Sequence, residues 1–273
     1  MSVTSGVSPI SQVARRKDLW WQFTVRAVEL RHKGSYLGMV WAVLTPLLML
    51  TLYAVVFGVI FGARFGVLPN ETGTDFVLAL FLGQLLFQVL AETLVVAPTI
   101  IVSNPNLVKK VVFPLDLLPL AQLGAFWFHL AVSFGLLLIG AFFAGRGITL
   151  QALWLPVILL PLLLLSAGLA WLLAALGVFF RDITQLMPFV AQIILYSSAI
   201  VYSQQRLHAS PVLWSILRWN PLLHTVQLAR DALLWNAPLH TSHLAYTYVC
   251  GAAVFVFGRW AFLKMQPAFA DVV

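Results

Sequence analysis

Six long apolar stretches constrain this chain more than any other feature of its sequence. They cover residues 37–61, 76–102, 117–144, 152–180, 186–202 and 244–262. Most of them exceed the roughly 20 apolar residues that an α-helix needs to span a bilayer, and the fifth is the shortest. The sequence therefore predicts an all-α integral membrane protein with six transmembrane helices.

The composition excludes several classes of protein. Hydrophobic residues make up 61% of the 273 residues, charged residues only 9%, and the mean hydropathy is +0.95. A soluble domain has about 25% charged residues, so this chain has too few polar groups to cover a soluble surface. A soluble enzyme, a disordered protein and a nucleic-acid-binding module are therefore excluded. The net charge of +7 forms no basic domain or tail.

The distribution of basic residues predicts the orientation of the chain. Six crossings place both termini on one side, and with that side in the cytoplasm 11 of the 16 Lys and Arg residues are cytoplasmic. Lys and Arg collect on the cytoplasmic side of membrane proteins. We therefore expect a multi-pass protein of the cytoplasmic (inner) membrane with both termini in the cytoplasm.

Residues 18–33 precede the first apolar stretch and have the pattern of an amphipathic helix. Such a helix lies in the membrane interface with its apolar face towards the lipid. That face carries Leu19, Trp20, Phe23, Ala27, Val28 and Leu30. Arg31 falls on the same face, and we expect its long side chain to reach the interface. The chain therefore divides into a cytoplasmic N-terminus, residues 1–36, and one transmembrane domain, residues 37–273. A helix packed on a partner protein is the alternative for residues 18–33.

A short helix is predicted between the second and third stretches. Asn104 is a favourable N-cap, Pro105 suits the first helical position, and Pro114 ends the helix at about Phe113. At 1.5 Å per residue this helix is about 13 Å long. Its mixture of apolar and basic residues predicts a cytoplasmic docking surface for a partner, with a capped loop as the alternative.

Residues 203–242 are apolar but interrupted. Two helix starts, Ser210-Pro211 and Asn220-Pro221, precede helices of about 8 and 14 residues. These lengths suit re-entrant or interfacial helices rather than spans. Non-helical backbone at membrane depth is tolerated only against protein or a water-filled cavity. We therefore expect this region to line or cap a pathway on the outer side, with tryptophans at interface depth at Trp214, Trp219 and Trp235.

The sequence carries no motif for catalysis or metal binding. A P-loop is excluded because the chain contains no Gly-Lys pair, and there is no H-E-x-x-H motif or Cys/His cluster. Cys250 is the only cysteine, so the chain forms no internal disulfide. We therefore expect no catalytic residue, metal site or cofactor in this chain, which by itself is not an enzyme.

Few ionisable residues lie inside the apolar stretches. Glu92 is the main one, and because a carboxylate is costly in lipid it should either face the interior of the bundle or be protonated. No second acid or matching histidine lies on the same helix, which argues against a proton relay. Arg181-Asp182 and Arg230-Asp231 are expected to neutralise their charges locally.

Four separated motifs occur in order along residues 19–235. They are RHKGSYLGMVW (31–41) with LTPL (44–47), NLVKKVVFP (106–114) with LP (118–119), FRDI (180–183), and WNPL (219–222) with Arg230. Together they resemble the type-2 ABC transporter permeases that export O-antigen, capsular polysaccharide or teichoic acid.

The resemblance implies an assembly. Two copies of the chain form a homodimer around a channel, and two copies of a separate ATP-binding subunit bind ATP and magnesium beneath it. The substrate is a polysaccharide carried on undecaprenyl diphosphate or a related lipid. O-antigen is our first expectation, with capsular polysaccharide and teichoic acid as alternatives.

The resemblance also assigns roles to three groups of residues. The coupling helix that seats in the ATP-binding subunit comprises Asn104, Pro105, Asn106, Leu107, Val108, Lys109, Lys110, Phe113 and Pro114. The channel entrance comprises Trp20, Arg31, Lys33, Gly34, Ser35, Tyr36, Gly38 and Trp41. The outer gate comprises Pro211, Trp214, Asn220, Pro221, Arg230 and Asp231. Arg31 and Lys33 are expected to contact the lipid diphosphate.

Three other functions fit the sequence less well. The R-x-K-G-S-x-L-G run argues against an exporter of drugs or small lipids from the same superfamily. A membrane glycosyltransferase needs acidic or metal-binding residues at one membrane face, whereas Glu71, Asp75 and Asp182 are scattered. A secondary transporter usually has internal repeats and ion sites within the membrane, and the sequence indicates neither.

Overall fold

The structure is a computed structural model that describes residues 9–109, 113–144, 150–204, 207 and 210–272. Every regular element in these residues is a helix. Five helical segments are long and apolar enough to cross a membrane: Gly38–Ile60, Gly73–Thr99, Leu117–Phe143, Leu150–Phe179 and Thr241–Val272. They correspond to the first four and the sixth of the predicted stretches, so an all-helical, multi-pass fold is confirmed.

The fifth predicted stretch differs from the others. Residues 186–202 fall largely in α7 (Ile183–Ser197), whose 15 residues are about 22 Å long at 1.5 Å each. The hydrocarbon core of a bilayer is about 30 Å thick, so α7 is short for a crossing. The chain turns just after it, where Ala199 adopts a left-handed φ of 51°. Five spans are supported in the described residues, and the count of six stays a prediction.

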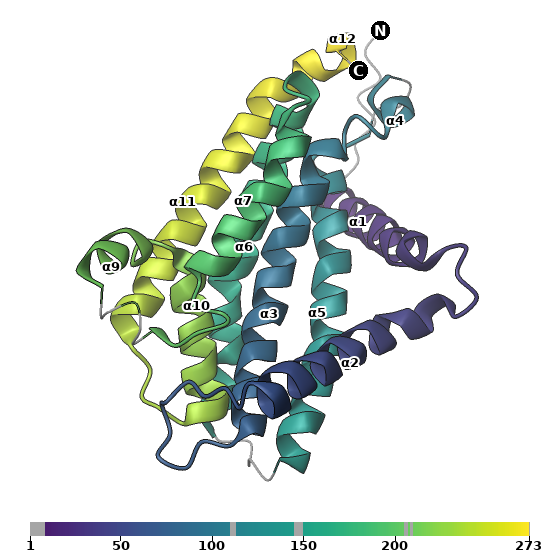
Figure 1. The fold of residues 1–273 in the computed structure, drawn as a ribbon. Coiled ribbons are helices and arrows are strands. Elements are labelled where there is room, and N and C mark those ends of the chain that lie inside the picture. Colours follow the sequence, from purple (N-terminus) through teal and green to yellow (C-terminus); the bar gives the residue numbers. More distant parts are fainter. Residues whose placement is uncertain (1–8, 110–112, 145–149, 205–206, 208–209, 273) are drawn as a thin grey trace, which may run out of the picture.

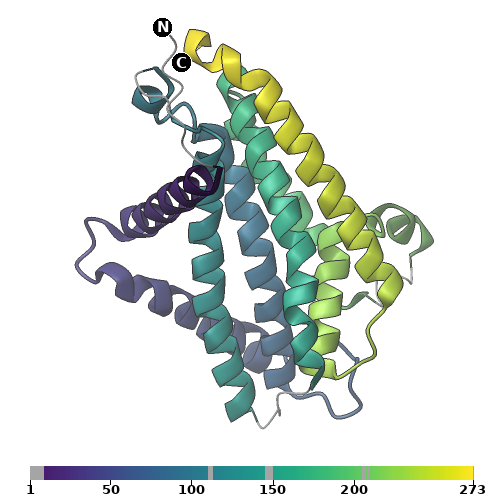
Figure 2. The same ribbon diagram turned by 180° about the vertical axis from the view of Figure 1, so that it is seen from behind.

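Four helices form the bundle. They run side by side in both ribbon views (Figure 1, Figure 2) and are α3 (Gly73–Val96), α5 (Leu117–Phe143), α6 (Leu155–Phe179) and α11 (Thr241–Met265). α3 is the most deeply buried, with 72% of its most apolar window inside the molecule. A capping box fixes its start, because Thr72 and Asp75 each accept a hydrogen bond from the other's backbone N–H.

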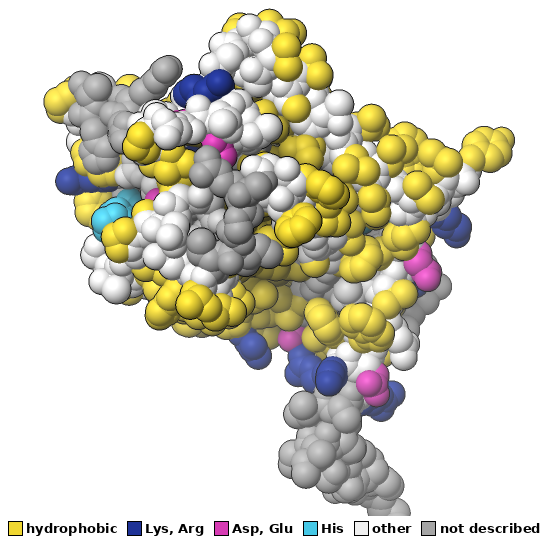
Figure 3. Space-filling model, turned by 90° about the horizontal axis from the view of Figure 1, so that it is seen from below, with side chains coloured by type: hydrophobic (Ala, Val, Ile, Leu, Met, Phe, Trp, Pro, Cys, Tyr) yellow, Lys and Arg dark blue, Asp and Glu magenta, His cyan; other side chains and the backbone are white. Residues whose placement is uncertain are grey.

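The bundle has two different ends. α4 (Pro105–Lys109) and α12 (Phe269–Val272) lie together at one of them, here called the terminal end (Figure 1). The opposite end, here called the far end, carries the loop of residues 61–72 and a π-helical segment, η5 (Asp231–Trp235). Seen from the far end, most side chains are hydrophobic and few are charged (Figure 3).

α1 (Pro9–His32) is the predicted amphipathic helix, and it begins nine residues before Asp18. It packs on α5, where the indole N–H of Trp20 donates to the carbonyl of Leu120 at 3.1 Å. One helical turn before Trp20, Arg16 of α1 forms an ion pair of 2.5 Å with Asp116. These contacts hold α1 against the start of the third span.

The first span is the least covered part of the bundle. It consists of a short 3₁₀ turn (Gly38–Val40), α2 (Trp41–Tyr53) and a π-helical turn, η2 (Ala54–Ile60), and it crosses the bundle obliquely (Figure 1). None of its most apolar window is buried. An apolar helix with this exposure needs lipid or another chain to cover it.

α6 and α11 approach each other closely through glycines. A β-carbon at Gly258 would collide with the backbone of Gly168, and one at Gly168 would collide with the backbone of Val254. Small residues let membrane helices approach closely, and the resulting dispersion contacts hold them together where lipid provides no hydrophobic drive. This contact keeps the last span against the core.

We predict that Gly258→Ala destabilises the protein by about 1–3 kcal/mol, because a rigid backbone cannot move aside as a side chain would. Gly135→Ala is the matched control, since a β-carbon there has no atom within 4 Å. Thermal unfolding in detergent measures both variants. Equal unfolding midpoints would show that the glycines do not set the distance between α6 and α11.

Candidate functional site

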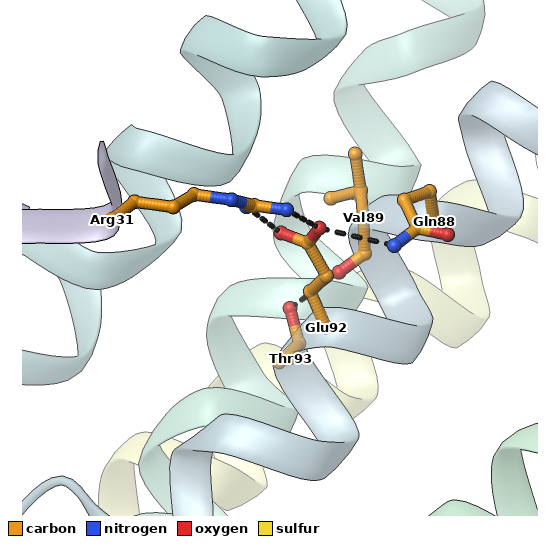
Figure 4. Close-up of polar contacts among 5 residues, drawn as sticks. All are labelled: Arg31, Gln88, Val89, Glu92 and Thr93. Atoms are coloured by element: carbon orange, nitrogen blue, oxygen red, sulfur yellow. Dashed lines mark hydrogen bonds and ion pairs between the residues drawn. The ribbon is translucent and has the colours of Figure 1, made fainter. Parts of the chain in front are cut away.

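A polar cluster joins the end of α1 to the middle of the bundle. Arg31 donates from its two terminal nitrogens to the two oxygens of Glu92, at 2.7 and 2.5 Å. Gln88, one turn earlier on α3, donates to the same carboxylate at 3.0 Å (Figure 4). Two parallel bonds of this kind fix the orientation of both side chains. The cluster therefore fastens the interfacial helix to the second span.

This pairing corrects the expectation that Arg31 extends to the interface. The Arg31 side chain is 41% exposed and that of Glu92 13% exposed, so the carboxylate sits deeper than the guanidinium. A carboxylate at membrane depth needs a cation or donors nearby, and Arg31 and Gln88 provide them. The hydrogen bonds to Glu92 raise the pKa of Arg31 above its ordinary value.

A pocket of about 240 Å³ extends from this cluster between α1, α2, α3 and α5. At the α1 level it is lined by Arg31, Glu92, His32 and His129. The two histidine rings lie 5.3 Å apart edge to face, and neither buried Nε2 has a hydrogen-bond partner among the described residues. Eleven residues before Glu92 on α3, about 16 Å away, the lining becomes apolar at Phe81. The pocket is therefore polar at one end and apolar at the other.

The structure brings only part of the predicted entrance set to this pocket. Arg31 and Trp41 line it, whereas Lys33 is exposed and is not among the lining residues. Trp41 donates to the Ser35 hydroxyl at 2.8 Å, across the turn between α1 and the first span. That turn uses two left-handed residues, at φ values of 87° and 50°, which only glycine adopts without strain. These residues are Gly34 and Gly38. They and the exposed Tyr36 therefore form the turn and do not line the pocket.

α4 lies where the sequence predicts a docking helix. It begins at Pro105 as predicted, and its described part ends at Lys109, while residues 110–112 lie outside the described residues. The Asn104 side-chain amide donates to the carbonyl of Ile100 at 2.8 Å, which ties the start of α4 to the second span. The side chains of Pro105, Asn106 and Lys109 are exposed.

The inner side of α4 rests on other parts of the protein. Leu107 and Val108 pack against the main hydrophobic core. Phe113, just after α4, contacts Phe23 of α1 at a ring distance of 4.9 Å. The sequence did not indicate the C-terminal neighbour of α4, which is α12, whose residue Phe269 is fully buried. α4 and the residue that follows its described part therefore contact α1, the core and the end of the last span.

Two short helices lie between α7 and α11, as predicted, and the segment that they form is here called the hairpin. They are α9 (Pro211–Leu217) and α10 (Pro221–Arg230), each starting at its predicted proline. Asn220 caps α10 by accepting from the N–H of Leu222 at 3.0 Å. The expected cap at Ser210 is wrong, because its side chain makes no cap bond. Trp214, on α9, packs into a small cluster of buried residues.

Arg230 fastens this hairpin to the bundle. Its guanidinium is buried and donates to the carbonyls of Ala79, Ala199 and Ile200 at 2.8 to 2.9 Å. It also lies 4.5 Å above the ring of Phe65. The carbonyls of Ala199 and Ile200 lack helical partners because α7 ends before them, and Arg230 supplies the missing donors. Asn220 adds two bonds of 2.9 Å to Ser197 and Ser198.

The two Arg-Asp pairs form no direct ion pair. Among the described residues the ion pairs are Arg16–Asp116 and Arg31–Glu92, so neither Arg230–Asp231 nor Arg181–Asp182 is one of them. The charges of Arg230 and Asp231 still attract each other, but the Arg230 guanidinium donates to backbone carbonyls and Asp231 accepts from Gln227. Side chains of adjacent helical residues point in different directions, which explains the result.

Comparison with known proteins gives a family. The sequence model described as ABC-2 type transporter matches residues 18–234. The O-antigen export system permease protein RfbA of Klebsiella pneumoniae is 25% identical over 94% of this chain and 95% of its own length. RfbA of Myxococcus xanthus is 24% identical over 78% of this chain and 79% of its own length. The polysialic acid transport protein KpsM of Escherichia coli is 27% identical over 76% and 78%.

We predict that Arg31 and Glu92 stabilise the protein as a unit. Arg31→Gln and Glu92→Gln should each cost about 1 kcal/mol, a value reduced for the partial exposure of Arg31, and the double variant should cost less than their sum. Arg26→Gln, on the exposed face of α1, is the control and should have little effect. Thermal unfolding measures the stability of all variants. If the double variant lost as much stability as the two single variants together, the pair would not hold α1.

We predict that Arg230→Met lowers stability by about 3 kcal/mol, because the buried carbonyls of Ala199 and Ile200 lose their donor and that of Ala79 loses its second one. Arg230→Lys should recover only part of the loss, since one ammonium group cannot reach all three carbonyls. The exposed Arg218→Met is the matched control. Limited proteolysis of the hairpin, together with the unfolding midpoint, reports the effect; an unchanged cleavage pattern in Arg230→Met would exclude this anchoring role.

Proposed function

This chain belongs to the ABC-2 type transporter family, and we propose that it is the membrane subunit of an exporter that moves a lipid-linked polysaccharide out of the cytoplasm. The observation that carries the proposal is the match to O-antigen export permeases over 94% of the chain. O-antigen is the first candidate polymer, because the match to the polysialic acid permease covers a smaller share, 76%. The orientation in this proposal places the terminal end in the cytoplasm and the far end outside.

The energy comes from a separate ATP-binding subunit, because the sequence has no P-loop. α4 is the contact proposed for that subunit. Its exposed Pro105, Asn106 and Lys109 face away from the core, while Leu107 and Val108 rest on it. Closure of the ATP-binding subunits on ATP and magnesium then pushes on α4, and the push reaches the spans through the contacts of its inner side.

A second copy of the chain completes the channel in this proposal. The support is the first span, which exposes apolar side chains such as Leu48, Val59 and Ile60 along its length. A symmetric pair can bury this surface in the contact between copies. A passage for a long polymer has to open and close. Spans that contact each other across a dimer can move apart and return without unfolding the core of either copy.

The pocket beside Arg31 is the proposed entrance for the lipid head. Arg31 has five N–H groups and uses two of them on Glu92, so donors remain for a diphosphate oxygen. Lys33 is exposed nearby at the interface and adds positive charge. The α9–α10 hairpin is the proposed outer gate; α9 lies beside the middle of the bundle, and α10 leads from there towards η5 at the far end (Figure 1). Weak contacts at many positions suit a polymer that has to keep moving.

We predict that the chain purifies from mild detergent with a stoichiometric P-loop ATPase when it is expressed with its neighbouring genes. Lys109→Glu should reduce the recovered ATPase and the polymer export several-fold, because it reverses a charge on the exposed side of α4. Lys17→Glu, an exposed charge reversal on α1, is the control. A chain that purifies alone, without ATPase activity, would contradict the proposal and favour a secondary transporter or an enzyme.

A further inference from the structure

A polar pocket of about 260 Å³ lies at the far end, between the hairpin, η5 and the start of α11. The chain has few polar residues to place there, since charged residues make up 9% of it and it has six histidines in all. Seen from the far end, histidine side chains lie near acidic ones at one edge of a mostly hydrophobic surface (Figure 3). The polar lining of the pocket is Ser203, Gln204, Gln227, Asp231, His240 and His243.

Hydrogen bonds hold Asp231 in a fixed position in this lining. Its side chain accepts from Gln227 at 3.0 Å, and its backbone carbonyl accepts from the N–H of Ala237 at 3.0 Å. The residue is only 4% exposed, so its carboxylate is held at the wall of the pocket. Opposite, on the start of α11, the rings of His240 and His243 lie 5.4 Å apart. Trp235 adds an aromatic ring to the same wall.

The chemistry of this lining selects a class of ligand. A carboxylate accepts hydrogen bonds, and amides and imidazoles both donate and accept, so the wall complements hydroxyl groups in either role. No Lys or Arg is among the lining residues, and the carboxylate repels anions. Asp231, His240 and His243 are not arranged to hold a metal ion, and no such group of three His, Cys, Asp or Glu side chains occurs in the part of the chain that the structure describes. A hydroxyl-rich, uncharged molecule therefore fits better than a phosphate, an acidic sugar or a metal ion.

The size of the pocket limits what it holds. Sites for drug-sized ligands occupy about 300–1,000 Å³, so a pocket of about 260 Å³ suits a single ring. We propose that it is a binding subsite for one uncharged sugar residue of the exported polymer. The inference rests on the proposed function. Gln227 is on α10 and Asp231 begins η5, whereas His240 and His243 lie at the start of α11. A sugar bound between them would therefore contact both the hairpin and the last span.

Photo-crosslinking tests the subsite in cells that export the polymer. A benzoylphenylalanine that replaces His240, an exposed wall residue, should attach the glycan to the permease and shift it to a ladder of higher mass. The same group at Val249, which is 68% exposed on the outside of α11, is the matched control and should give no glycan adduct. Absence of adduct at His240 in cells that still export polymer would overturn the subsite.

Two further measurements sharpen the result. Loss of ATP-dependent export from the proposed assembly is scored separately, so that failure of the proposed function is distinguished from failure of the subsite. In a host that makes an acidic polymer the adduct at His240 should fall at least fivefold, and equal labelling by both polymers would contradict the choice of an uncharged sugar.

Asp231→Asn should lower the crosslinking yield at position 240 at least fivefold, because it replaces one acceptor of the wall by a donor. It should leave the unfolding midpoint close to that of the parent, since the shape and the contact with Gln227 are kept. Glu29→Gln, on the exposed face of α1, is the control. An unchanged yield in Asp231→Asn with intact folding would exclude Asp231 from the site.

Discussion

Lipid offers no hydrogen bonds, so every polar group that this chain places at membrane depth has to find its partner inside the protein. Two arginines show how the constraint is met. Arg31 is bonded to the carboxylate of Glu92, and Arg230 to three backbone carbonyls. Each contact joins segments that are far apart in the sequence. The first fastens α1, which also packs on α5, to α3, and the second fastens the hairpin to α3 and to the residues just after α7.

The same constraint explains where the helices are broken. α7 ends early, and the carbonyls of Ala199 and Ile200 just after it accept from Arg230 instead of from a further helical turn. The hairpin is thereby attached through one side chain both to the residues after α7 and to α3.

Hydropathy and helix-start signals predicted most of the architecture. The spans around α3, α5 and α6 and the helix starts at Pro105, Pro211 and Pro221 follow from patterns within a few neighbouring residues. Pairings between distant segments did not follow, because a helical wheel shows which face a residue occupies but not which helix that face meets. The link between Arg31 and Glu92 was missed for this reason, as was the support of α4 by α12. The first half of α1 was also missed, since its amphipathic pattern is clear only from Asp18 onwards.

We propose that this chain and an ATP-binding subunit together move a glycan through a membrane. Transport by the purified complex in proteoliposomes tests it most directly, with a lipid-linked glycan on the side of the ATP-binding subunit and a glycan-cleaving enzyme on the other side. We expect cleavage products to accumulate with ATP and magnesium, and we expect this accumulation to stop when ATP is replaced by a non-hydrolysable analogue. The proposal would be contradicted if products accumulated equally with the analogue. It would also be contradicted if no products accumulated with ATP although the complex hydrolysed the ATP.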